Sequence, residues 1–120
     1  MSGKFGDRLM HIDGQFVPGS DDQWIDSVNP GTEEVHGRVP VGTVHDVNRA
    51  ADAAEAAQPG WAGLSVWERR DALRKLGAAM RARAAEILPL EAADTGNTIG
   101  SLARDVEVAA NYLDFFSGLG

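Results

Sequence analysis

Two groups of residues in this sequence could carry chemistry: its histidines and a short segment bounded by glycines. His11, His36 and His45 could bind a metal, but they fall on different expected elements and lack the spacing of a zinc ligand set. Gly96-Asn97-Thr98-Ile99-Gly100 precedes a helix and could hold a phosphate. It lacks the lysine and the preceding strand of a phosphate-binding loop, so we interpret it as the end of one helix before the next.

Basic residues gather between positions 69 and 83 and could form a surface for RNA. They are Arg69, Arg70, Arg74, Lys75, Arg81 and Arg83. Acidic residues stand among them, and the formal net charge of the chain is −7, which argues against nucleic acid as a partner. We interpret this segment as a solvated or intersubunit helix face.

The chain has 120 residues and 0 cysteines, which excludes a cysteine nucleophile, a thiolate zinc site and a disulfide within it. It is 43% hydrophobic and 24% charged, a composition that indicates a folded protein without membrane spans. The segment Met1–Leu9 carries charges and glycines instead of the apolar centre of a signal peptide. We therefore expect a cytoplasmic location and no membrane partner.

The first part of the chain predicts short strands. Asp13-Gly14 separates Met10–Ile12 from Gln15–Val17 and is typical of a type I′ hairpin turn. A second pair of extended segments surrounds Asn29-Pro30, where proline fixes its own φ and Gly31 can take a positive φ that most residues avoid. The first half of the chain should therefore contain two small strand pairs.

Helices follow. Thr43 with Asp46 has the spacing of a capping box, and that helix should end at Gln58–Gly60. Ser65 with Glu68 predicts the start of the next helix in the same way.

That second helix meets Pro89, which a helix interior tolerates poorly. A break near Arg83–Ala85 would place Pro89 in the first turn of a short third helix that ends at Asp94–Asn97. A last helix should run from Thr98 to Ser117 with one apolar stripe.

These elements predict an α/β fold with short β-hairpins, three or four helices and an incomplete sheet. A hairpin needs a third strand or a helix for stability, and alanine covers much of one helix. We expect residues 1–120 to form no complete domain, and the apolar helix surfaces to cover a sheet formed by residues beyond Gly120.

The order of several segments resembles the N-terminal region of the NAD(P)-dependent aldehyde dehydrogenase superfamily, from Ile12 to Gly118. The matching segments are Ile12–Phe16, Val28–Thr32, Asp46–Ala50, Asp94–Gly96 and Phe115–Gly118. The chain departs from the family at Asn97-Thr98, where Lys-Pro is usual, and at Glu33, where glycine is usual. If that position needs a positive φ, Glu33 adds about 1 kcal/mol of strain.

The resemblance implies an enzyme that oxidises an aldehyde to a carboxylic acid with NAD or NADP. It also implies that the cysteine nucleophile, the glutamate base and the dinucleotide-binding strands lie after the region matched here. Accordingly, no catalytic and no cofactor-binding residue is assigned in this chain, and the chain alone should be inactive and need no cofactor. The resemblance implies a homo-oligomer for the full-length enzyme and leaves the aldehyde and the choice of cofactor open.

Two minor roles also follow from the resemblance. Val28, through its backbone carbonyl, and Asp94 match positions that bind a monovalent cation in some members; the alternative is a strand residue and a solvated acid. Arg104 and Val108 match positions that line the substrate funnel, where Arg104 would select acidic or polar aldehydes. The alternative is an exposed arginine beside a core valine.

A second function of a different class remains open. The chain could be a standalone, non-catalytic assembly or binding module of dehydrogenase ancestry. Its folding as an independent unit would distinguish this reading from that of an enzyme segment.

Overall fold

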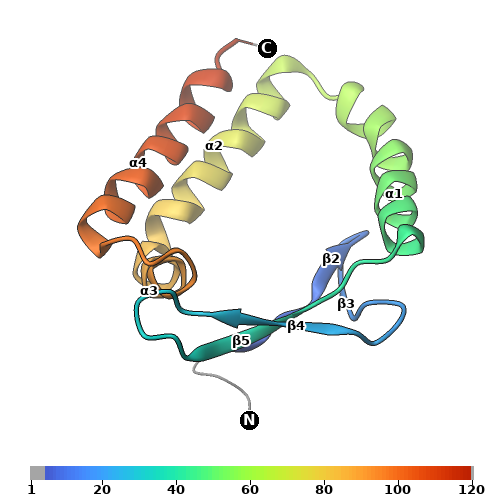
Figure 1. Cartoon of the computed structure of the whole chain (residues 1–120). Coiled ribbons are helices and arrows are strands. Elements are labelled where there is room, and N and C mark those ends of the chain that lie inside the picture. Colours follow the sequence, from blue (N-terminus) through green and yellow to red (C-terminus); the bar gives the residue numbers. More distant parts are fainter. Residues whose placement is uncertain (1–4, 120) are drawn as a thin grey trace. The chain divides into compact units, whose positions relative to one another are not determined.

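The computed structural model describes residues 5–119 and divides the chain into two compact units, Met1–Gly60 and Trp61–Gly120. Residues 1–4 and Gly120 lie outside the described residues, so the sequence-based expectation for Met1–Leu9 falls partly on residues that the structure does not describe. Short strands come first and helices follow, as the sequence predicts for an α/β fold (Figure 1). Each unit is described separately below.

The larger sheet of the first unit has the strand order β1-β5-β4. Its centre is β5 (Val35–Pro40), which pairs antiparallel with β4 (Trp24–Val28) and parallel with β1 (Gly6–Asp7) (Figure 1). The register of β4 and β5 shifts between Ser27 and Val28. The two extended segments predicted around Asn29-Pro30 therefore form one antiparallel pair.

A separate hairpin joins β2 (Met10–Ile12) to β3 (Gln15–Val17). Asp13 and Gly14 have φ angles of 52° and 73°. Both central residues of a type I′ turn need positive φ, so the predicted hairpin is confirmed.

In the turn between β4 and β5 the positive φ falls on Glu33, at 60°, and not on Gly31. The strain expected if this position needs a positive φ therefore applies to Glu33. The Asn29 side-chain oxygen accepts from Gly31 N at 2.8 Å, and the Asn29 carbonyl accepts from Glu33 N at 2.8 Å. These bonds close the turn around Asn29 and leave the left-handed conformation to Glu33.

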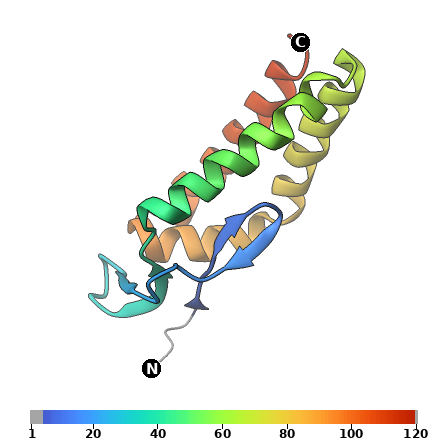
Figure 2. The ribbon, with the colours of Figure 1, turned by 90° about the vertical axis from the view of Figure 1, so that its right-hand side faces the viewer.

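Helix α1 (Val44–Ala62) begins after the predicted cap and extends past its predicted end at Gln58–Gly60. Figure 2 shows it as one continuous helix, although Pro59 lies inside it. The proline removes only the bond to the carbonyl four residues earlier, and its own φ is helical, so the last turn can still form. The apolar side chain of Val47 on α1 is open to solvent, with 64% of its surface exposed.

The second unit holds α2 (Val66–Ala82), α3 (Ala84–Thr95) and α4 (Ile99–Phe116). The predicted break falls at Arg83, but α3 starts at once, so Pro89 lies in its second turn and not in its first. Gly96 ends α3 with φ of 74°, as predicted. The last helix starts one residue after its predicted start, and Thr98 caps it by accepting from Ser101 N.

Close packing of α2 on α4 forms the core of the second unit. A Cβ added to Gly77 would lie 3.2 Å from the Ala110 carbonyl oxygen, so only a very small residue fits there. Leu102 and Ala110 are buried in the middle of the predicted α4 stripe, while its ends at Ile99 and Phe116 are 56% and 57% exposed.

Both units leave large apolar side chains at the surface. Among the described residues, Ile12, Leu102 and Ala110 are the buried apolar ones. Exposed strand residues include Phe16, Ile25 and Val39, and exposed helix residues include Trp67, Tyr112 and Phe115. None of the helices in residues 5–119 has the length and apolar character needed to cross a bilayer.

Candidate functional site

The two residues predicted to bind a cation belong to different units. Val28 ends β4 beside the register shift, and its side chain is half exposed. Asp94 is an exposed residue near the end of α3. Because the two residues belong to different units, the structure does not test a cation site that they share, and the site stays a prediction.

Two of the three histidines, His36 and His11, make contacts within the first unit, while His45 is exposed on α1. His36 is buried in β5, and its Nε2 lies 2.9 Å from Ser27 Oγ on β4. His11 packs edge-on against Phe16, with ring centroids 5.2 Å apart. Within residues 5–119 no three histidine, aspartate or glutamate side chains gather as a metal site would require.

The predicted funnel residues lie on α4. Val108 lines an open hollow of about 400 Å³ together with Asn111, Tyr112 and Phe115. Arg104 precedes Val108 by four residues, which places it on the same side of the helix, but it is not part of the wall. Val108 therefore lines this hollow together with three residues that were not predicted to face the substrate.

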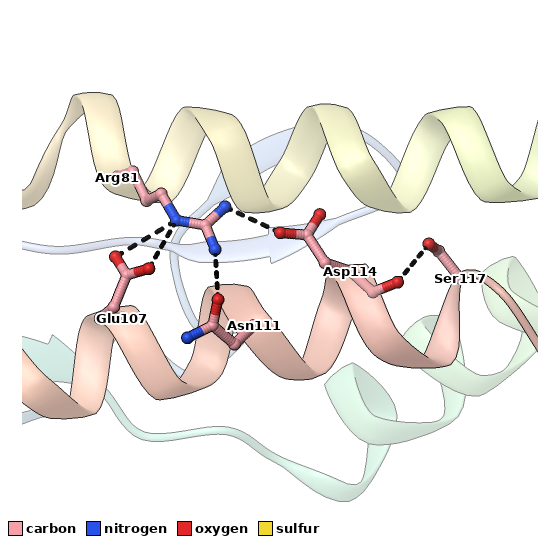
Figure 3. Close-up of polar contacts among 5 residues, drawn as sticks. All are labelled: Arg81, Glu107, Asn111, Asp114 and Ser117. Atoms are coloured by element: carbon pink, nitrogen blue, oxygen red, sulfur yellow. Dashed lines mark hydrogen bonds and ion pairs between the residues drawn. The ribbon is translucent and has the colours of Figure 1, made fainter.

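Arg81 organises a polar cluster between α2 and α4 (Figure 3). Its Nε donates to the Glu107 carboxylate at 3.1 Å, and its Nη1 donates to Asp114 Oδ2 at 3.0 Å. Its Nη2 donates to Asn111 Oδ1 at 2.7 Å. The hydrogen bonds that Arg81 donates to Asp114 and Glu107 raise the pKa of Arg81, so the guanidinium stays charged.

The sequence did not predict this cluster: Arg81 was assigned to a solvated or intersubunit helix face. A signal was present: Glu107, Asn111 and Asp114 repeat at helical spacing beside the apolar stripe of α4. Arg83, by contrast, pairs with Glu86 three residues later and is largely exposed, as predicted.

Asp46 organises the polar contacts of the first unit. Its carboxylate accepts from Ser20 N at 3.1 Å and Ser20 Oγ at 2.5 Å, and from Thr43 N at 3.0 Å and Thr43 Oγ1 at 2.9 Å. The hydrogen bond from the Ser20 hydroxyl, followed by those from the backbone, holds the pKa of Asp46 well below its usual range. The carboxylate is ionised and fully engaged, which suits a structural role and not proton transfer.

Taken together, the described residues form an α/β scaffold with two polar clusters that hold its elements and one open, mostly apolar wall on α4. The whole chain has 0 cysteines, so it supplies no cysteine nucleophile. This arrangement defines the class of mixed α/β folds with short strands in small, incomplete sheets.

Comparison with known proteins gives the family. Residues 16–120 match the aldehyde dehydrogenase family. Lactaldehyde dehydrogenase of Escherichia coli K12 is 49% identical over 110 residues, which are 90% of this chain and 22% of that protein. The aldehyde dehydrogenase tropH of Talaromyces stipitatus is 35% identical and is matched over 21% of its length.

A solved structure agrees. The crystal structure of lactaldehyde dehydrogenase from Escherichia coli superimposes with a TM-score of 0.90 at 42% identity, over 94% of this chain and 24% of that one. The chain belongs to the aldehyde dehydrogenase family. It spans about a quarter or less of the length of these relatives and corresponds to their N-terminal region.

Proposed function

We propose that this chain is the N-terminal segment of an NAD(P)-dependent aldehyde dehydrogenase that oxidises an aldehyde to a carboxylic acid. The observation that carries the proposal is the family match over residues 16–120, together with 49% identity to lactaldehyde dehydrogenase. That relative makes a short hydroxylated aldehyde the first substrate to test. The chain has 0 cysteines, so the thiolate that attacks the aldehyde comes from other residues, and the chain alone is inactive.

In this proposal the chain supplies structure around the reaction. The exposed apolar side chains of both units cover other parts of the enzyme, and the α4 face with Arg104 and Val108 lines the route of the aldehyde. Val28 and Asp94 contribute to a monovalent cation site. NAD or NADP binds in the full-length enzyme, which is a cytoplasmic homo-oligomer.

The experiment has two arms. In the first, the chain alone is mixed with NAD or NADP and lactaldehyde, and reduced cofactor is followed by absorbance; we expect none. In the second, the chain replaces the matching N-terminal segment of the Escherichia coli lactaldehyde dehydrogenase, and we expect an active chimera. Turnover by the purified chain alone, or a folded but inactive chimera, would contradict the proposal.

A standalone module is the second candidate, because each unit closes its own polar cluster. It predicts that the monomeric chain unfolds in one cooperative thermal transition and exposes little apolar surface to a hydrophobic dye. The enzyme-segment proposal predicts strong dye binding and a tendency to associate, because large apolar side chains are exposed.

A further inference from the structure

We propose that Arg81 is a positioning residue that fixes the side-chain amide of Asn111, and that this amide selects a hydroxylated aldehyde at the α4 hollow. The inference rests on the proposed function, in which the α4 face lines the route of the aldehyde. It deepens that function by naming the group that recognises the substrate and the group that holds it in place.

The chemistry of the guanidinium fixes the orientation of Asn111. A guanidinium has only donors, so the atom of Asn111 that meets Arg81 Nη2 at 2.7 Å must be the carbonyl oxygen Oδ1. The amide nitrogen Nδ2 is then directed away from Arg81, as the close-up shows (Figure 3). An asparagine without this bond could turn either its oxygen or its N–H groups toward a ligand. In Asn111 the oxygen is held by Arg81, so the N–H groups are the end left for a ligand.

Arg81 is itself held firmly. Glu107 accepts from its Nε and Asp114 from its Nη1, and both belong to α4, as Asn111 does. The Arg81 side chain is 33% exposed, so solvent competes with these bonds less than at an open surface. Three contacts on one helix therefore leave the guanidinium little freedom to release the amide.

The amide lies in an otherwise largely apolar wall. Asn111 lines the hollow with Val108, Tyr112 and Phe115, all of which are more than two-fifths exposed in this chain. In the proposed enzyme other residues cover this wall and exclude water from it. An N–H donor there favours a ligand with an oxygen in reach, and a ligand without that oxygen leaves the donor unpaired. A hydroxyl beside the aldehyde carbon supplies that oxygen.

The test compares lactaldehyde with propanal, which lacks only the hydroxyl, in the chimera that carries this chain. For Arg81→Met and Asn111→Leu we expect the preference for lactaldehyde in kcat/KM to fall about fivefold to tenfold, the worth of one hydrogen bond. The loss should appear in KM for lactaldehyde, with propanal unaffected. Arg81→Lys, which keeps the charge but cannot bond all its partners at once, should behave like Arg81→Met.

Arg83→Met is the matched control, because Arg83 pairs with Glu86 and has no bond to α4 among the described contacts. It should leave the preference unchanged. The double variant of Arg81 and Asn111 should lose no more than either single variant, because both remove the same donor. An active chimera whose preference survives Arg81→Met and Asn111→Leu would overturn the inference while the proposed function stands.

The positioning step is also tested in the 120-residue chain, without activity. The side-chain amide resonances of Asn111 should shift in Arg81→Lys and stay in place in Arg83→Met. Unchanged Asn111 resonances in a folded Arg81→Lys chain would overturn the inference, whatever the chimera does. A folded but inactive chimera would count against the proposed function instead.

Discussion

The helices α1 and α2 begin with the same four-residue device, yet only one of the two caps reaches beyond its own helix. At α2, Ser65 and Glu68 bond each other's backbone and the cap stays exposed and local. At α1, Thr43 and Asp46 do the same, but the Asp46 carboxylate also accepts two hydrogen bonds from Ser20, which is 26 residues earlier. The Asp46 side chain is 1% exposed as a result.

The difference shows that a capping box can be a local feature or a tertiary contact. Glu68 holds the first turn of a helix. Asp46 holds a first turn and also fixes the loop after β3 against it, so removing this carboxylate should loosen elements far apart in the sequence. The two caps should therefore differ sharply in what their loss does.

The largest effect is expected for Asp46→Ala compared with Glu68→Ala. Asp46→Ala leaves the donors of Ser20 and Thr43 without their acceptor in a nearly buried place, so the melting temperature should fall by several degrees. Glu68→Ala should lower it much less, because water replaces the lost bonds at an exposed site. Thermal unfolding followed by circular dichroism measures both.

Hydrogen exchange locates the damage. With Asp46→Ala, amides near Ser20 and in the first turn of α1 should lose protection, while those of α2 and α4 keep theirs. Asp52→Ala is the control, since Asp52 is exposed on the same helix. Equal effects of Asp46→Ala and Glu68→Ala would show that the tie to Ser20 adds nothing.

Acid should gradually remove the stability that the ionised Asp46 carboxylate contributes. Hydrogen bonds from Ser20 and Thr43 lower the pKa of Asp46 in the folded chain below the ordinary value of 3.8. A carboxylate with a lowered pKa contributes its full stabilisation at any pH above its ordinary pKa. That contribution is lost as the pH falls from the ordinary pKa through the lowered one. The melting-temperature gap between the wild type and Asp46→Asn should hold at neutral pH and shrink below about pH 4.

The control for the acid series is Asp52→Asn, whose gap should be small at every pH. A gap between wild type and Asp46→Asn that stays constant down to strongly acidic pH would mean that the Asp46 carboxylate is not held by these donors.

The hydroxyl groups of the two caps give a smaller contrast. Ser65→Ala removes the oxygen that accepts from Glu68 N, a change that typically costs about 1 kcal/mol. Ser20→Ala removes the donor at 2.5 Å from Asp46 and should cost more, because its partner is a buried carboxylate. Urea unfolding measures the loss of stability in both variants. A smaller loss for Ser20→Ala than for Ser65→Ala would contradict the stronger role of the Ser20 bond.

The features that were predicted correctly from the sequence are those formed by residues close together in the chain. Both capping boxes, the Asp13-Gly14 hairpin and the Gly96 helix end were predicted correctly, because their contacts join residues at most seven apart. The tie from Ser20 to Asp46 and the bond from Arg81 to Asn111 could not be predicted, because each joins elements whose packing the pattern does not specify.

The prolines show a different limit. A proline weakens a helix without forbidding it, so the neighbouring turns decide where the helix ends. Pro59 and Pro89 therefore both lie inside helices that the sequence rule would have ended or shifted. The substrate-facing role of Arg104 and Val108 and the cation role of Val28 and Asp94 came from resemblance and remain predictions.

The smallest effect is expected at the turn between β4 and β5, where local strain can be separated from tertiary contact. Glu33 has φ of 60°, which costs a residue with a Cβ about 1–2 kcal/mol, whereas glycine adopts it freely. Glu33→Gly also makes the unfolded chain more flexible and so loses about 0.4–1 kcal/mol of this gain. We expect a net stabilisation below about 1 kcal/mol by urea unfolding. The neighbouring Glu34 has no positive φ to relieve, so Glu34→Gly, the control, should only destabilise the fold. If both glycine variants destabilise equally, Glu33 stores no strain. The turn would then tolerate glutamate as well as the glycine that is usual in the family.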